Sequence, residues 1–319
     1  ILESKNLEIT LLVDKNIDRA KELSEKYNIP NVSADYSEVV EYADSAIVCV
    51  PHFLHAPISI DLLKQGINVL VEKPMATTKS DCLKMIRASK KHKSVLSVGN
   101  FRRYLNSHKF AHWIFKNEIL GKIECFDFRE GNVYGWPVKS DFFFNKDSAG
   151  GGVLIDTGAH TLDLLLWWLG DYSSFKYYDD SHGGVEADCM LELKMKSGAT
   201  GIVELSRTRD LRNTAIITGE QATMEIDLRN NIFKLYSLDQ KFGIIGEGLS
   251  QNLIEEKQSF RKLFQDQMID WIQSIGDKSL PSVSGNHVIK SIDLIEKCYM
   301  QKQSLELPWI NPITANLKL

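Results

Sequence analysis

Residues 46–74 read AIVCVPHFLHAPISIDLLKQGINVLVEKP, and this segment gives the clearest indication of the fold class. It opens with one continuous apolar run, Ala46–Val50, and closes with a second, Ile67–Val71. Uninterrupted apolar runs of this length are typical of strands that are covered on both faces. The segment between them, His55–Gln65, has helical spacing and ends at Gly66. A strand, a helix and a second strand predict a βαβ unit and therefore a parallel sheet.

The flanking sequence continues this alternation on both sides. Three more strands are predicted, at Glu8–Val13, Asn31–Ser33 and Val95–Val98. Three more helices are predicted, at Asp18–Tyr27, Tyr36–Tyr42 and Ser80–Lys91. We therefore predict an α/β fold with a doubly wound parallel sheet over residues 1–100. Sheets of this class bind ligands at the carboxyl ends of their strands.

Beyond Asn100 the pattern changes to successive strands that are joined by short turns. The predicted strands are Lys122–Tyr134, Met190–Met195, Thr200–Thr208, Thr214–Thr218, Ala222–Asp227 and Ile232–Tyr236. The predicted helices are Asn106–Ile119, Gly150–Leu169, Phe260–Ile275 and His287–Gln301. We predict a second α/β domain over residues 101–319, with an open, mostly antiparallel sheet. The pattern leaves open whether the C-terminal end returns to the first domain.

Length and composition agree with this division and exclude several classes of protein. A chain of 319 residues suggests two domains at roughly 150 residues each. With 43% hydrophobic residues and a net charge of −4, it is neither a disordered tail nor a general nucleic-acid binder. It has no apolar run of the about 20 residues that span a membrane, so we expect no membrane partner. The five cysteines form no C-x-x-C pair, which predicts reduced thiols and a cytoplasmic protein.

Two candidate residues follow predicted strands of the first domain. Asp14 ends the first strand, where an acid can bind the ribose hydroxyls of a dinucleotide. Because a 2′-phosphate would meet like charge there, Asp14 favours NAD over NADP. Lys73 follows the strand Ile67–Val71, and a lysine at a strand end is suited to proton handling. A solvated turn aspartate and a surface lysine are the alternatives.

The second domain contains GGGVLIDTGAH at residues 150–160. Three glycines allow the backbone to approach a ligand or another element closely. Asp156 and His160 are four residues apart and therefore share one face of the predicted helix, which Asp163 continues. A carboxylate beside a histidine in an apolar helix suggests a functional site. A metal site formed by these three side chains and a purely structural pair are the alternatives.

Glu72-Lys73-Pro74 after a buried strand, followed about 80 residues later by GGGVLIDTGAH, resembles the Gfo/Idh/MocA oxidoreductases. The resemblance runs from about residue 7 to residue 300. It implies an N-terminal Rossmann domain, a C-terminal α/β domain and hydride transfer between a nicotinamide cofactor and a carbinol carbon. Sugars, polyols and sugar derivatives are the implied substrates.

The resemblance also implies roles for individual residues. Lys73, Asp156 and His160 match the catalytic positions, with His160 as base, Asp156 orienting the substrate or imidazole, and Lys73 polarising the oxygen. We expect these three side chains to converge and the Lys73-Pro74 peptide bond to be cis. His52 stands where many members carry asparagine. The positions that match the cofactor side are Asp14, Pro51, His55, Glu72, Lys73 and Asn100.

Substrate contacts are expected from residues near these motifs. Arg102 and Arg103 follow Asn100 and are suited to the nucleotide or to an anionic substrate. Arg207 and Arg209 share one face of a predicted strand and are suited to a carboxylate or phosphate, with a surface role as the alternative. Tyr134, Trp136 and Phe142–Phe144 precede the glycines and offer aromatic faces for a sugar ring or for core packing. Together with Asp156 and His160, the residues Arg103, Tyr134 and Trp136 form the candidate substrate site.

Two other functions remain possible for the same residues. The scaffold also suits a non-catalytic dinucleotide-binding regulator or an NAD-dependent glycosidase.

We expect a homodimer or homotetramer, because Val203 and Leu205 are predicted on a sheet face that helices leave uncovered. A dinucleotide fold opens with a strand and a G-x-G-x-x-G loop, which this chain lacks. We therefore expect about 20 further residues before Ile1 in the native protein.

Overall fold

A computed structural model describes residues 7–135, 141–239, 241–247 and 259–305. The chain divides into two compact units: unit 1 comprises residues 1–105 and 250–293, and unit 2 comprises residues 106–249 and 294–319. Unit 1 therefore includes residues 250–293, and the sequence had left open whether the C-terminal end returns to the first domain. Two hydrogen bonds join this segment to the rest of unit 1: Val98 N donates to Val283 O at 3.0 Å, and Tyr104 Oη donates to Asp270 at 2.8 Å. Both contacts join the parallel-sheet region to the segment that ends at residue 293.

Unit 1 alternates strands and helices, as the sequence predicts. Its strands are β1 (Leu11–Val13), β2 (Asn31–Ser33), β3 (Ser45–Val48), β4 (Asn68–Val71) and β5 (Leu96–Val98). Its longer helices are α1 (Ile17–Tyr27), α3 (His52–Lys64), α4 (Lys79–His92) and α9 (Phe260–Asp277). Short helical turns are η1 (Tyr36–Glu38), α2 (Val39–Tyr42) and η2 (Phe101–Tyr104). The strand pairs that the structure describes in this unit are all parallel, which confirms the predicted parallel pairing.

The described strands of unit 1 form two sheets, β1-β2 and β3-β4-β5. A cavity of about 600 Å³ is lined by residues of both sheets, including Leu12, Ile47 and Leu70. Phe264 and Met268 of α9 also line it. The lining is mainly apolar, because the predicted strands carry apolar residues at both faces.

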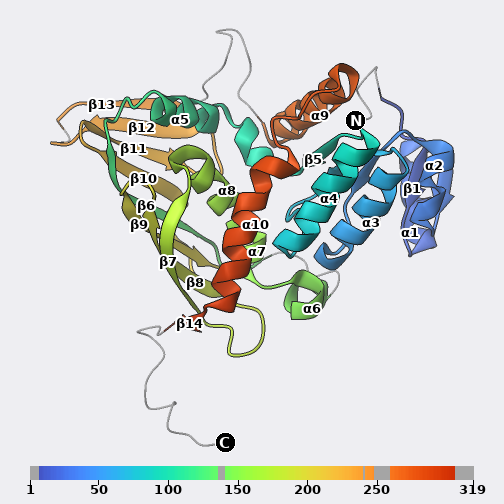
Figure 1. Ribbon diagram of the computed structural model, residues 1–319, viewed down its shortest axis with the longest axis horizontal. Coiled ribbons are helices and arrows are strands. Elements are labelled where there is room, and N and C mark those ends of the chain that lie inside the picture. Colours follow the sequence, from blue (N-terminus) through green and yellow to red (C-terminus); the bar gives the residue numbers. More distant parts are fainter. Residues whose placement is uncertain (1–6, 136–140, 240, 248–258, 306–319) are drawn as a thin grey trace, which may run out of the picture. The chain divides into compact units, whose positions relative to one another are not determined.

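Unit 2 contains a nine-stranded sheet in the order β13-β12-β11-β10-β6-β9-β8-β7-β14 (Figure 1). Neighbouring strands are antiparallel except for the pairs β6–β9 and β7–β14. The prediction of an open, mostly antiparallel sheet is therefore confirmed. The strands are β6 (Ile123–Gly131), β7 (Tyr172–Asp179), β8 (Asp188–Met195), β9 (Thr200–Ser206), β10 (Thr214–Gly219), β11 (Ala222–Asp227), β12 (Ile232–Ser237), β13 (Gly243–Glu247) and β14 (Gln303–Ser304).

One face of this sheet packs against α5 (Asn106–Lys116) and α8 (Gly158–Leu169) (Figure 1). Trp168 of α8 lies 6.0 Å from the ring of Phe128 on β6, and both side chains are buried. The expectation that Val203 and Leu205 lie on an uncovered face is wrong, because both are fully buried. Strand residues alternate between faces, so Ile202 and Glu204, only half-buried, point to the other side.

The remaining helices are η3 (Asp141–Phe144), α6 (Lys146–Ala149), α7 (Val153–Asp156) and α10 (Gly285–Met300). The boundary between the two units falls within α10. All five cysteines are free thiols. Of the helices that the structure describes, none has the length and apolarity needed to cross a membrane.

Candidate active site

Three candidate residues of unit 1 follow neighbouring parallel strands. Pro51 is the N-cap of α3 after β3, Lys73 follows β4, and Asn100 follows β5. Because the carboxyl ends of parallel strands meet at one edge of a sheet, these residues share one edge of the sheet β3-β4-β5. Asp14 has the corresponding place after β1 in the two-stranded sheet. The sequence-predicted cofactor residues of this unit therefore lie at strand ends, as expected.

The turn that carries Lys73 is built around the Glu72 carboxylate. Lys73 N donates to Glu72 Oε2 at 3.2 Å, and the Lys73-Pro74 peptide bond is cis, as predicted. A Cβ atom on Gly99 would lie 2.8 Å from Glu72 Oε2 and 3.2 Å from Glu72 Cα, so a larger residue there would crowd the Glu72 side chain. Burial raises the pKa of Glu72.

His55 connects this turn to the preceding strand end. Its side chain is 1% exposed, with Nδ1 2.7 Å from Pro74 O and Nε2 2.8 Å from Val50 O. Burial lowers the pKa of His55. Because both ring nitrogens face backbone carbonyls, this histidine fixes the two loops after β3 and β4 relative to each other. Its neighbour His52 is also buried, with the two ring centroids 5.6 Å apart.

Two observations test whether unit 1 fits a dinucleotide. Asn100 is 1% exposed, and neither polar atom of its side-chain amide has a hydrogen-bond partner among the residues that the structure describes. A buried amide without partners is costly, which suggests that a ligand satisfies it. Asp14 is half-buried, and its Oδ1 accepts a hydrogen bond from Asn16 N at 2.9 Å. Both residues fit the roles that the sequence predicts for them.

In unit 2 the predicted helix Gly150–Leu169 is divided into α7 and α8, which meet at Thr157. Thr157 keeps helical dihedral angles, so Asp156 and His160 still lie one turn apart. Asp156 is part-exposed, whereas His160 is buried at 5% exposure. Lys73 belongs to unit 1 and the other two residues to unit 2, so their convergence stays a prediction.

The triple glycine packs against another element of unit 2. A Cβ atom on Gly151 would lie 2.0 Å from Tyr299 Oη, and one on Gly152 would lie 1.9 Å from Glu186 O. The Glu186 carboxylate accepts hydrogen bonds from Gly152 N at 2.8 Å, Leu154 N at 2.9 Å and Tyr299 Oη at 2.8 Å. It therefore caps the N-terminus of the helical turn that bears Asp156. Burial raises the pKa of Glu186.

A second buried carboxylate holds α8. Glu130 is 0% exposed on β6 and accepts a hydrogen bond from Thr161 Oγ1 at 2.6 Å. Its other oxygen lies 2.9 Å from Arg229 Nε. Sequence reasoning missed both Glu130 and Glu186. Glu130 lies near the end of β6 and Glu186 precedes β8, and neither has a characteristic spacing to the residues it binds.

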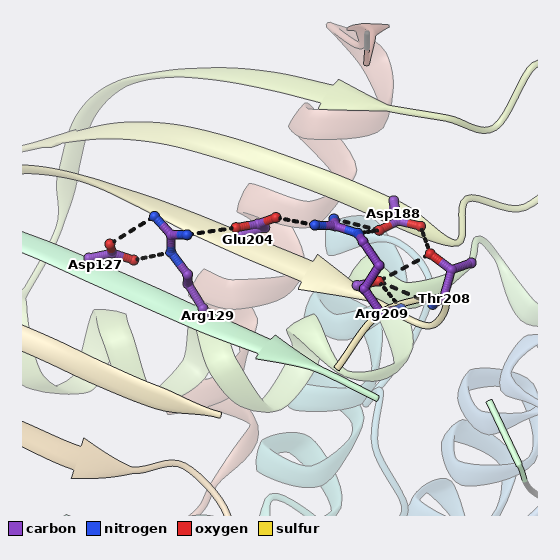
Figure 2. A network of polar contacts seen from close by, with 7 residues as sticks. Asp127, Arg129, Asp188, Glu204, Thr208 and Arg209 are labelled. Carbon is purple, nitrogen blue, oxygen red and sulfur yellow. Dashed lines mark hydrogen bonds and ion pairs between the residues drawn. The ribbon is translucent and has the colours of Figure 1, made fainter. Parts of the chain in front are cut away.

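Arg207 pairs with Asp156, with Arg207 Nη2 2.8 Å from Asp156 Oδ2. The sequence suggested that Arg207 and Arg209 bind an anion. The anion that Arg207 binds in the structure is the carboxylate of Asp156. Arg209 instead binds Asp188 and Glu204 in a network that continues to Arg129 and Asp127 (Figure 2).

The predicted substrate residues have different surroundings. Arg103 is 7% exposed on η2 of unit 1. Tyr134 in unit 2 is half-buried, with its ring 5.7 Å from Phe144 and 5.8 Å from the Arg207 guanidinium carbon. Trp136 lies outside the described residues. Among the residues that the structure does describe, no group of three or more His, Cys, Asp or Glu side chains is arranged to hold a metal ion.

Comparison with known proteins identifies related sequences and folds. D-glucoside 3-dehydrogenase of Escherichia coli (strain K12) is 31% identical over 170 residues, covering 52% of this chain and 47% of that protein. Matches to three curated relatives cover 46% to 65% of their lengths, so the chain spans about half to two thirds of them.

Solved structures share the fold over most of the chain. Aldose-aldose oxidoreductase from Caulobacter crescentus, complexed with glycerol, has a TM-score of 0.81 at 23% identity, covering 92% of this chain and 89% of that one. Levoglucosan dehydrogenase, in complex with NADH and levoglucosan, has a TM-score of 0.79 at 19% identity, covering 92% of this chain and 87% of that one.

Two family descriptions match consecutive parts of the chain. Residues 1–100 match the "oxidoreductase family, NAD-binding Rossmann fold", and residues 109–225 match the "GFO/IDH/MocA C-terminal domain". These are the two domains, in the same order, that the motifs around Lys73 and His160 imply. The chain therefore belongs to the Gfo/Idh/MocA family of oxidoreductases, with an NAD-binding Rossmann domain followed by the family's C-terminal domain.

Proposed function

We propose that this protein is an NAD(P)-dependent oxidoreductase that transfers a hydride between the nicotinamide cofactor and a carbinol or carbonyl carbon. The observation that carries the proposal is the presence of Lys73, Asp156 and His160 together in a member of this family. A protein that only senses a dinucleotide has no need for a set of residues that handle protons. We also propose a cytoplasmic location, because the odd number of cysteines and the lack of a C-x-x-C pair are typical of proteins with reduced thiols.

The cofactor supplies the hydride acceptor, and the chain supplies the proton acceptor and the electrostatic environment. In the oxidative direction, His160 takes the hydroxyl proton while the hydride leaves the same carbon, which gives a carbonyl. The ordinary pKa of histidine lies near neutrality, which suits this role. Lys73 polarises the substrate oxygen, and Asp156 orients the substrate. Pro51, His55 and Glu72 shape the loops on the cofactor side.

The cofactor is proposed to be NAD, with NADP as the less favoured alternative. Asp14 at the end of β1 is placed to accept hydrogen bonds from ribose hydroxyls, and its charge opposes a 2′-phosphate. Asn100 is proposed to satisfy its buried amide on the same cofactor. The NADH complex of levoglucosan dehydrogenase, which shares the fold, supports this assignment.

The proposed substrate is a sugar, polyol or sugar derivative. D-glucoside 3-dehydrogenase and levoglucosan dehydrogenase are named for substrates of this class, which supports the proposal. In unit 2, Tyr134 offers a half-buried aromatic ring near the Arg207–Asp156 pair. Arg103 and Trp136 are proposed to complete the substrate contacts.

We also propose a homodimer or homotetramer formed through the nine-stranded sheet. The face of this sheet opposite α5 and α8 carries half-buried apolar side chains such as Ile202 and Ile216. Apolar side chains on an open sheet face are typical of an interface, and a second copy of the chain is the proposed occupant.

A turnover screen tests the proposed activity. The purified protein is incubated with NAD⁺ or NADP⁺ and a set of polyols, sugars and nucleotide sugars, and absorbance of the reduced cofactor is followed at neutral pH. We expect net cofactor reduction with at least one substrate. Release of free sugar without net reduction would instead indicate an NAD-dependent glycosidase.

Two variants then test the assignment of residues. His160→Asn should lower kcat by about 10²- to 10⁴-fold, the range for loss of a general base, with dinucleotide affinity unchanged. Lys73→Met should lower kcat, because it removes a positive charge proposed to lie beside the substrate oxygen on which negative charge develops. Near-native turnover in His160→Asn with none in Lys73→Met would make Lys73 the base. Turnover unaffected in both variants would remove Lys73 and His160 from the proposed catalytic set, and the absence of any turnover in the screen would favour the regulator.

A further inference from the structure

The ion pair between Arg207 and Asp156 is enclosed by other groups of unit 2. The Arg207 side chain is 10% exposed and the Asp156 side chain 23% exposed. Arg207 Nη2 also donates to Gly152 O at 3.4 Å, and its guanidinium carbon lies 5.8 Å from the centroid of the Tyr134 ring. The guanidinium therefore contacts the beginning and the end of the α7 turn at the same time.

The backbone of Arg207 is fixed on both sides. Arg207 N donates to Ala187 O at 2.8 Å, and Arg207 O accepts from Tyr134 N at 2.8 Å. These two bonds connect the residue to the chain before β8 and to the chain after β6. An arginine whose backbone is held by two neighbouring segments places its planar guanidinium with little freedom.

The residues that follow Arg207 are anchored on the opposite face of the sheet. Ser206 Oγ accepts hydrogen bonds from Thr208 N at 3.1 Å and Arg209 N at 2.9 Å. Thr208 Oγ1 donates to the buried carboxylate of Asp188, which also binds Arg209 at 2.7 Å (Figure 2). The network of Asp188, Thr208 and Arg209 therefore prevents the segment after β9 from shifting.

We propose that Arg207 is a positioning residue that holds Asp156 as a fixed anion. The inference rests on the proposed function, in which Asp156 orients the substrate. A guanidinium stays protonated at any physiological pH, and at hydrogen-bond distance it favours the ionised carboxylate. Asp156 then acts as a hydrogen-bond acceptor in one defined place and does not compete with His160 for the substrate proton.

Arg207→Met tests the proposal, with Lys196→Met as the matched control. Lys196 lies in the turn between β8 and β9 of the same unit and pairs with Asp171 at 3.3 Å, with its side chain 67% exposed. We expect Arg207→Met to lower kcat by about 10- to 100-fold while the NAD dissociation constant stays within about twofold. Added guanidinium ion should restore part of the rate, and Arg207→Lys should retain more activity than Arg207→Met. Lys196→Met should keep the wild-type rate.

A second measurement is independent of activity. The unfolding midpoints of Arg207→Met, Asp156→Asn and the double variant form a double-mutant cycle. If Arg207 holds the Asp156 carboxylate, the decrease in midpoint of the double variant differs from the sum of the two single decreases. Wild-type turnover in Arg207→Met, or additive losses in the cycle, would overturn the proposal. If the wild-type protein turns over no substrate in the screen, the proposed function fails, and the cycle alone decides whether Arg207 holds Asp156.

Discussion

Gly152→Ala should destabilise unit 2 strongly, because the added methyl group has no space. The new Cβ atom would lie 1.9 Å from Glu186 O, 2.7 Å from Glu186 N and 2.8 Å from Glu186 C. All three are backbone atoms, so no rotamer change relieves the overlap. Contacts of Cβ atoms below 3.0 Å essentially never occur, so the two backbones must separate from 1.9 Å to at least 3.0 Å.

That separation breaks the hydrogen bonds that hold the α7 turn. Gly152 N and Leu154 N donate to the Glu186 carboxylate at 2.8 and 2.9 Å, and Val153 N donates to Glu186 O at 2.9 Å. A buried polar group that loses its partner costs about 1–3 kcal/mol. With two or three groups affected and some relaxation, we expect a loss of about 3–5 kcal/mol in the free energy of unfolding.

Gly276→Ala is the matched control, because the same substitution there is expected to increase the free energy of unfolding. Gly276 lies in α9, and nothing lies within 4 Å of its ideal Cβ position. Replacing a helical glycine by alanine stabilises by about 0.5–1 kcal/mol. Urea unfolding followed by tryptophan fluorescence measures both variants, since Trp168 is buried on α8 of unit 2 and Trp271 on α9 of unit 1. Gly152→Ala as stable as the wild type would refute this account of the glycines.

Three further outcomes are expected. Asn100→Leu should weaken NAD binding by about tenfold or more in calorimetry and slightly raise the unfolding temperature of the free protein, because its buried amide lacks partners; unchanged affinity would remove Asn100 from the cofactor site. Burial raises the pKa of Glu72, so folding favours its protonated form and stability falls as pH rises past the carboxyl's ordinary range. Glu72→Gln should therefore reduce the difference in unfolding temperature between pH 4 and pH 8, and an unchanged difference would contradict this. Light scattering at micromolar concentration should give a dimer or tetramer that Ile216→Glu dissociates, whereas a monomeric wild type would exclude the proposed interface.

Most elements of unit 1 could be predicted from the sequence because each has a local signal. Asn31–Ser33 was predicted with its observed bounds, and the helix Asp18–Tyr27 begins one residue early, at Ile17. The capping residues explain this agreement: Asn16 accepts from Arg19 N, and Asn28 ends α1 in the left-handed region. Local chemistry of this kind is readable without knowledge of the tertiary structure.

Strands β7 and β13 of unit 2 were not predicted, since their sequences lack a regular alternation. In β7, whose bounds are Tyr172–Asp179, buried and exposed residues do not alternate until Lys176, and the register with β8 shifts between Tyr172 and Ser174. In β13 the exposed Ile244 and Ile245 follow each other. The assignment of Val203 and Leu205 to the wrong face has a related cause, because periodicity shows which residues share a face but not which face helices cover.

In the candidate site, too, the sequence indicates residues that are close together along the chain but not the partners that lie far from them in sequence. Asp156 and His160 are one helical turn apart, so their spacing indicates that they belong together. The groups that hold them come from far along the chain: Glu186 lies 34 residues from Gly152, and Arg207 lies 51 residues from Asp156. No pattern in a single sequence specifies which of several acidic or basic residues makes such a contact.

The two turns that carry the proposed catalytic residues have a common construction. In each, a glutamate with a burial-raised pKa accepts a backbone N–H from the turn, Glu72 from Lys73 and Glu186 from Gly152 and Leu154. In each, a glycine provides the space, because a Cβ atom on Gly99 or Gly152 would overlap that glutamate. The glycines near both motifs therefore serve the placement of Lys73 and Asp156 through a glutamate side chain, and their substitution should act on the chemistry only through the loss of that placement.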